Sequence, residues 1–112
     1  MTEPTKTKLC DVRARLDDAS VLARCSARGA ILEVDSDPGV DESLIGDVVA
    51  SAANLASQAS ELVVGDDITT LVIGKVAAIA SRRLRDGTWA SMLVTDPSSV
   101  GLAVEALASI EI

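Results

Sequence analysis

Three arginines, Arg82, Arg83 and Arg85, form the one concentrated basic group of an acidic sequence. Guanidinium groups bind carboxylates and phosphates through paired hydrogen bonds. The group is therefore either a solubilising strand edge or a contact with an acidic surface or a nucleotide phosphate on another protein. Trp89, the single aromatic residue, follows shortly after. Because tryptophan is enriched at the energetic centres of interfaces, we interpret Trp89 as either a core anchor or an interface anchor.

Two further patterns resemble binding motifs but are better explained as turns. Gly65 and Gly74-Lys75 are superficially like a phosphate loop, yet eight residues separate these glycines and Val76 stands where the motif needs Ser or Thr. Pairs of aspartates, which in principle bind a hard cation, all fall in predicted connections, where Asp is favoured for turn and capping reasons. These pairs are Asp17/Asp18, Asp35/Asp37 and Asp66/Asp67. We predict neither a nucleotide-binding loop nor a metal site.

The composition excludes several classes of function. The 112 residues carry a formal net charge of −7 and contain no His, Phe or Tyr. Without histidine there is no imidazole base, Ser-His-Asp triad or imidazole metal ligand. One aromatic ring and an acidic balance disfavour nucleic-acid binding. We therefore expect no catalytic site, no cofactor and no nucleic-acid partner.

The cysteines and the N-terminus suggest a cytoplasmic protein. Cys10 and Cys25 do not resemble a disulfide framework, and Cys25 lies among small apolar residues, where a thiol is usually an inert core filler. Residues 1–7 are polar and are expected to form a flexible tail without a signal peptide. No apolar run is long enough to cross a bilayer, so we expect no membrane insertion. Residues 8–112 are predicted to form one domain.

The first part of the chain predicts a helix followed by a hairpin. Apolar spacing indicates a short helix over about 8–18. Alternation over 21–25 and again over 30–35 predicts two strands joined by a Gly-containing turn. The second strand is predicted to end at Ser36-Asp37-Pro38-Gly39, because all four residue types are favoured in turns.

The clearest predicted element is a helix over about 40–63. Its apolar residues follow helical spacing and form one stripe: Leu44, Val48, Ala52, Leu55, Ala59 and Leu62. Its other faces carry small residues instead of long charged ones: Gly46, Ala50, Ser51, Ala53, Ser57 and Ser60. A surface of small residues lets another helix approach closely, so it predicts self-association. The alternative is an Ala-rich helix covered by its own chain.

The rest of the chain predicts three strands and a last helix. The strands span about 68–73, 76–84 and 88–94, with Asp86-Gly87 as a two-residue hairpin. The first of them is β-branched and lacks the proline or inward charge that protects a sheet edge. Asp96-Pro97-Ser98-Ser99 then begins the final helix. The order α-β-β-α-β-β-β-α predicts an α+β fold with a five-stranded antiparallel sheet and helices packed on it.

This order resembles the Roadblock/LC7 family, which includes dynein light chains and bacterial gliding-motility regulators of the MglB type. The resemblance covers about Val12 to Leu107. It rests on Arg28-Gly29-Ala30-Ile31-Leu32, on the long helix of small residues, and on Leu84-Arg85-Asp86-Gly87-Thr88-Trp89-Ala90. The following Asp96-Pro97-Ser98-Ser99-Val100-Gly101-Leu102 is one residue shorter than the family pattern and lacks its Asn.

The resemblance implies a profilin-like layering and a dimer in which the long helices pack together and the sheets join edge to edge. We expect the interface to include Gly46, Ala50, Ala53, Ser57, Ile68, Thr70 and Val72. The resemblance also implies a non-enzymatic, cytoplasmic adaptor that binds a Ras-like small GTPase. The candidate contacts to that partner are Arg82, Arg83, Arg85 and Trp89. Two alternatives stay open: a PAS- or GAF-like sensory ligand-binding domain, and a purely structural self-assembling subunit.

Overall fold

The computed structural model describes residues 8–26, 28–62, 69–73, 75 and 77–110. The helices are α1 (Leu9–Arg13), α2 (Glu42–Leu62), the 3-10 helix η1 (Pro97–Ser99) and α3 (Val100–Ala108). The strands are β1 (Ala19–Cys25), β2 (Ile31–Ser36), β3 (Thr69–Ile73), β4 (Ala78–Arg83) and β5 (Trp89–Val94). The predicted α+β layering is confirmed.

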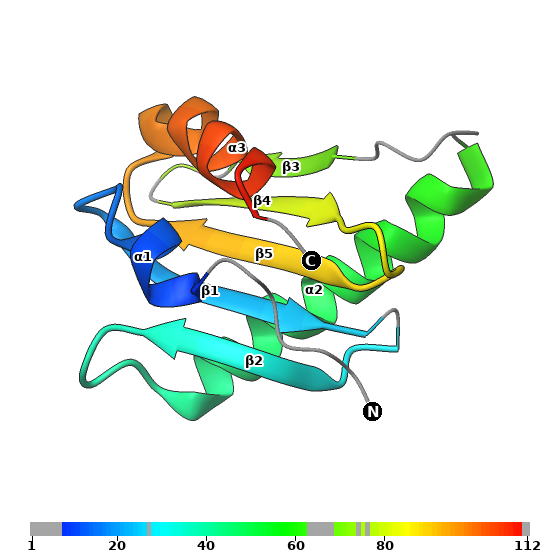
Figure 1. The fold of residues 1–112 in the computed structure, drawn as a ribbon, viewed down its shortest axis with the longest axis horizontal. Helices are drawn as coiled ribbons and strands as arrows, with labels where there is room; N and C mark the ends of the chain where they lie inside the picture. The colour runs from blue at the N-terminus through cyan, green and yellow to red at the C-terminus, as the bar shows by residue number, and fades with distance from the viewer. Residues whose placement is uncertain (1–7, 27, 63–68, 74, 76, 111–112) are drawn as a thin grey trace.

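The strands form one antiparallel sheet in the order β2-β1-β5-β4-β3. The two hairpins β1–β2 and β4–β5 lie side by side because β1 pairs with β5. Helices α1 and α3 cover one face of the sheet, and α2 crosses the other (Figure 1). The central strands are therefore buried on both faces, whereas β2 and β3 form the two edges.

Two apolar clusters hold these layers together. Leu22 and Met92 are fully buried beneath α1 and α3, together with Val12 and Leu107 from those helices. On the opposite face Val49 of α2 packs against a second cluster of β1 and β5 side chains, namely Val21, Ala23, Cys25, Trp89 and Leu93. The alternation predicted for 21–25 is thus confirmed, with a helix layer on each side of the strand.

Some predicted elements differ from those observed. The first helix ends at Arg13, and residues 14–18 form turns, so the prediction of a helix to about 18 was too long. The 3-10 helix η1 precedes α3 and was not predicted. Its start follows the expected capping chemistry, since the Asp96 carboxylate accepts a hydrogen bond from the Ser98 amide at 3.0 Å.

The predicted two-residue hairpin at Asp86-Gly87 is wrong by one residue. The Leu84 amide donates to the Thr88 carbonyl at 2.8 Å, so three residues form the loop. The Gly87 amide in turn donates to the Leu84 carbonyl, and Gly87 has a φ of 86°. A turn followed by a left-handed glycine is the usual three-residue hairpin connection, because only glycine adopts this φ without strain.

The start of α2 meets the sheet through residues that the predicted stripe did not include. Ile45 and Val49, four residues apart, pack on the sheet, while Leu44 of the predicted stripe is 40% exposed. The side chains of the other stripe residues lie outside the described set. The prediction therefore fails at Leu44, in the first turn of the helix, and for the rest of the stripe it stays a prediction.

Candidate interaction surfaces

Part of the predicted dimer surface is a solvent-facing strip of α2. Gly46 and Ala50 of that surface are exposed, as is the neighbouring Ser51, so this part of the helix is not covered by its own described chain. Such small residues allow a second helix to approach closely and lose little side-chain entropy on packing. The side chains of Ala53 and Ser57 lie outside the described residues.

The second part of that predicted surface is at the sheet edge. Thr70 and Val72 belong to β3, which pairs with β4 on one side only. An edge strand presents unpaired backbone groups toward its open side. Ile68 and the side chains of β3 lie outside the described residues, so the structure places this strand but not its side chains.

The arginine group is divided between different environments. Arg82 is half-buried, and its Nη1 donates a hydrogen bond to the Leu107 carbonyl at 3.1 Å. A cation near the carboxyl end of α3 is favoured by the helix dipole. This contact gives Arg82 a structural role within the chain, which the sequence analysis did not foresee.

Arg83 and Arg85 lie closer to the surface than Trp89 does. Arg83 is half-buried at the end of β4, and Arg85 is exposed in the hairpin loop. Trp89 lies opposite Arg83 in the β4–β5 register, but it is only 3% exposed and belongs to the apolar cluster beneath α2. Its burial favours the core anchor over the interface anchor, so Trp89 is removed from the candidate partner contacts.

Arg28 joins the candidate contacts, although the sequence did not predict it there. It is exposed in the connection between β1 and β2, and the pairing of Cys25 with Trp89 brings that connection to the same end of the sheet as the β4–β5 hairpin. Figure 1 shows the two hairpin turns next to each other. Arg28 comes close to the other hairpin only because β1 pairs with β5. Prediction of the two separate hairpins did not say that these strands are neighbours.

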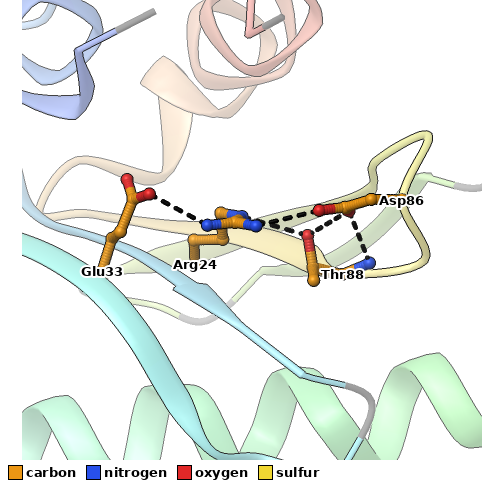
Figure 2. A network of polar contacts seen from close by, with 4 residues as sticks. All are labelled: Arg24, Glu33, Asp86 and Thr88. Atoms are coloured by element: carbon orange, nitrogen blue, oxygen red, sulfur yellow. Dashed lines mark hydrogen bonds and ion pairs between the residues drawn. The ribbon is translucent and has the colours of Figure 1, made fainter. Parts of the chain in front are cut away.

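A buried polar network lies between these hairpins and stabilises this end of the sheet (Figure 2). The Arg24 side chain is 3% exposed and forms ion pairs of 2.9 Å with both Glu33 and Asp86. Its Nε donates to the Thr88 hydroxyl at 3.2 Å. One guanidinium therefore joins β1 to β2 and to the β4–β5 loop, and its burial is compensated by two carboxylates.

The ionisation of Asp86 is coupled to this network. Burial by itself raises the pKa of the Asp86 carboxyl. The hydrogen bonds from Thr88 and Arg24 and the charge of Arg24 outweigh this effect, so the pKa lies below its ordinary value. Asp86 accepts hydrogen bonds from both the amide and the hydroxyl of Thr88. The network consequently holds a negative carboxylate that orients the arginine.

A second bridge ties α1 to the strand β2. The guanidinium of Arg13 pairs with Asp35 and Asp37, and it also donates to the Ala19 carbonyl at 3.1 Å. The carboxylate of Asp35 raises the pKa of the Arg13 guanidinium. Asp35 lies in β2 and not in a connection as predicted, and together with Asp37 just after the strand it anchors the helix that precedes them in the chain.

The described residues offer little for cofactor chemistry. No group of three or more His, Cys, Asp or Glu side chains among them is placed to hold a metal ion. Burial raises the pKa of the Cys25 thiol, which makes it a poor nucleophile. None of the described helices combines the length and apolarity needed to span a bilayer.

The architecture is that of several solved structures. It matches a Roadblock/LC7 domain from Streptomyces avermitilis with a TM-score of 0.64 at 16% identity, covering 89% of this chain and 88% of that one. The chain has the Roadblock/LC7 fold. MglB from Myxococcus xanthus also shares this fold, with a TM-score of 0.61, 13% identity and coverage of 91% and 89% of the two chains.

MglC from Myxococcus xanthus matches the Roadblock/LC7 fold of this chain with a TM-score of 0.61. The identity is 11%, and the match covers 86% of this chain and 88% of MglC. No protein-family model and no curated protein sequence matches the chain. The likeness therefore rests on the arrangement of the helices and strands.

Proposed function

We propose that this chain is a non-enzymatic, homodimeric regulator or scaffold that binds a Ras-like small GTPase and modulates its nucleotide cycle or its location. The observation that supports it most is the fold, which is shared with MglB and MglC over most of each chain. The sequence resemblance to the same family points to the same function.

The surfaces fit a dimeric adaptor. The exposed small residues Gly46, Ala50 and Ser51 on α2 and the edge strand β3 provide a route to self-association. One solved structure of this fold carries the description "MglB with tetrameric arrangement", so assembly beyond a dimer is known for that protein. For this chain we propose the dimer, with a larger assembly as the alternative.

The GTPase contact is proposed at the end of the sheet where the hairpins meet. Exposed Arg85 and Arg28 and half-buried Arg83 are available there, whereas Arg82 is engaged with the end of α3. Arginines at this position suit an acidic surface or a bound nucleotide phosphate. We assign them a binding role and not that of an arginine finger, since nothing places a guanidinium at a γ-phosphate.

A binding experiment tests this proposal. The chain is titrated with a purified Ras-like GTPase encoded in the same gene neighbourhood, loaded either with GDP or with a non-hydrolysable GTP analogue. We expect nucleotide-dependent binding that weakens about tenfold in Arg85→Ala, equivalent to about 1.4 kcal/mol. Arg15→Ala, which removes another exposed arginine, is the matched control and leaves binding unchanged.

The outcomes separate the parts of the proposal. Absence of binding to either nucleotide state contradicts the GTPase partner. Equal binding by Arg85→Ala and the unaltered chain contradicts only the assigned surface. A saturable thermal shift with a small metabolite, in place of GTPase binding, would favour the sensory alternative.

A further inference from the structure

The edge strand β2 exposes more large apolar surface than β1, β4 or β5, the other strands whose side chains are described. Ile31, Leu32 and Val34 are 46%, 45% and 46% exposed, three of the five exposed large apolar residues among those described. Leu44, in the first turn of the helix that follows β2, is a fourth. Neighbouring apolar residues exposed together mark an interaction site, because water contact with such a patch is unfavourable.

The open side of β2 also presents backbone hydrogen-bonding groups. The amide of Asp37 donates to the Ser20 carbonyl at 2.9 Å, and the register continues with Asp35 opposite Leu22. Residues of an antiparallel strand alternate between facing their partner strand and facing away. Val34 and Ser36 therefore direct their amides and carbonyls away from β1, where the described part of the chain places no further strand.

The negative charge around β2 favours a positively charged binding partner at this edge. Residues 30–50 contain six carboxylates and no lysine or arginine: Glu33, Asp35, Asp37, Asp41, Glu42 and Asp47. Arg24 and Arg13 neutralise part of this charge from the inner side, whereas Asp41, Glu42 and Asp47 remain exposed. A second copy placed here would bring like charges together, but a cationic segment would be attracted.

We propose that β2 is a docking edge for an extended, basic segment of a separate protein, which adds a strand beside Val34 and covers the three apolar side chains. Strand addition uses backbone hydrogen bonds for affinity and alternate side chains for specificity. In the bound segment, apolar residues would meet Ile31, Leu32 and Val34, and lysines or arginines would lie near the carboxylates that follow β2.

This edge is separate from the β3 edge, and Arg28 of the proposed GTPase contact lies in the connection that precedes it. In the order β2-β1-β5-β4-β3 it lies at the opposite side of the sheet from β3. Pairing of two β3 strands would thus leave the backbone edge of β2 open on each protomer. The failure of one proposal does not decide the other.

The test uses a labelled peptide of about nine residues that alternates lysine with valine, a length that spans an edge strand. Fluorescence anisotropy measures its affinity for the full chain, and amide NMR shifts locate the contact. We expect saturable binding with shifts centred on residues 31–36. A peptide of the same length that alternates glutamate with valine should bind at least tenfold more weakly.

Two variants and one control locate the site. Val34→Pro removes the outward amide at an edge position that tolerates proline, and Leu32→Ser removes apolar surface while the strand is kept. Each should weaken the lysine–valine peptide at least tenfold. Leu102→Ser changes an equally accessible leucine on α3, which is 57% exposed, and should leave binding unchanged.

Circular dichroism confirms that each variant is folded. Equal affinity for the two peptides, binding without shifts in β2, or undiminished binding by a folded Leu32→Ser variant overturns the proposal. No binding up to millimolar peptide overturns it as well. A fall in the assembly mass of the chain itself on Leu32→Ser would show that a second copy occupies the edge instead, which also contradicts it.

Discussion

At the scale of single residues, Arg24 is the side chain on which three segments depend. Its guanidinium contacts carboxylates from β2 and from the β4–β5 loop while it is almost completely buried. A buried charge is tolerated only with such partners, and removal of one member leaves the others incompletely paired. The sequence showed an arginine on a strand but not the two acids that meet it.

Replacement of Arg24 tests this dependence. Arg24→Met should lower the free energy of unfolding by about 2 kcal/mol, because two charge-assisted hydrogen bonds are lost while Glu33 and Asp86 keep partial access to water. Urea denaturation followed by the fluorescence of the single tryptophan measures the change. Arg15→Met, at an exposed arginine, should shift stability by less than about 0.5 kcal/mol.

The pH dependence of the same network has a definite sign. The pKa of Asp86 is lower in the folded chain than its ordinary value, so its stabilising contribution is complete above about pH 4 and is lost as the pH falls through the folded pKa. The stability difference between the unaltered chain and Asp86→Asn should therefore shrink on acidification from pH 6 to pH 2. Denaturation curves across that range measure it, and a constant difference would contradict the assignment.

The two thiols should differ in reactivity. Cys10 is exposed, whereas Cys25 is fully buried beneath α2 and burial raises its pKa. A disulfide reagent at pH 8 should modify Cys10 rapidly in the native chain and Cys25 only in denaturant. In Cys10→Ser the rapid phase should disappear. Rapid modification of both thiols would show that the α2 layer opens readily.

At the scale of elements, short-range signals were reliable where turn and cap chemistry is local. Gly87 occupies a left-handed φ, and Asp96 caps the start of η1 through Ser98. The end of α1 and the inward face of α2 were not predictable in the same way. Both depend on packing against the sheet, which buries Val49 with Ile45 beside it and leaves Leu44 exposed.

Two glycine substitutions, neither of which creates a steric clash, show the effect of backbone conformation on stability. A methyl group at Gly87 or at Gly101 would meet no atom within 4 Å, but only Gly87 has a positive φ. Gly87→Ala should therefore destabilise the chain by about 1 kcal/mol, and Gly101→Ala in α3 should stabilise it by up to about 1 kcal/mol. Thermal and urea unfolding compare them, and effects of the same sign would contradict the argument.

At the scale of the whole molecule, the sheet has two open edges with different properties. The edge at β3 lies beside the predicted dimer surface, and the edge at β2 exposes apolar residues followed by carboxylates. In the proposals made above, one edge serves self-association and the other binds a second protein. The two hairpin loops present arginines at one end of the same sheet.

The dimer is tested by charge placed on α2. Ala50→Glu should reduce self-association at least tenfold, about 1.4 kcal/mol, since a carboxylate would have to be desolvated where the helices approach. Sedimentation velocity over a range of concentrations measures it. Gln58→Glu adds the same charge at an exposed position of the same helix outside the predicted interface. A strict monomer at tens of micromolar in the unaltered chain would contradict the dimer itself.

The sequence by itself determined the α+β layering, the turns at glycines and the capped start of the last helix, because these depend on side-chain periodicity and local hydrogen bonds. Only the tertiary structure decided that β1 lies beside β5. That pairing buries Trp89, brings Arg24 to Asp86, 62 residues away, and leaves β2 at an edge. Contacts between distant segments depend on how the layers close over the core, and no local pattern encodes that choice.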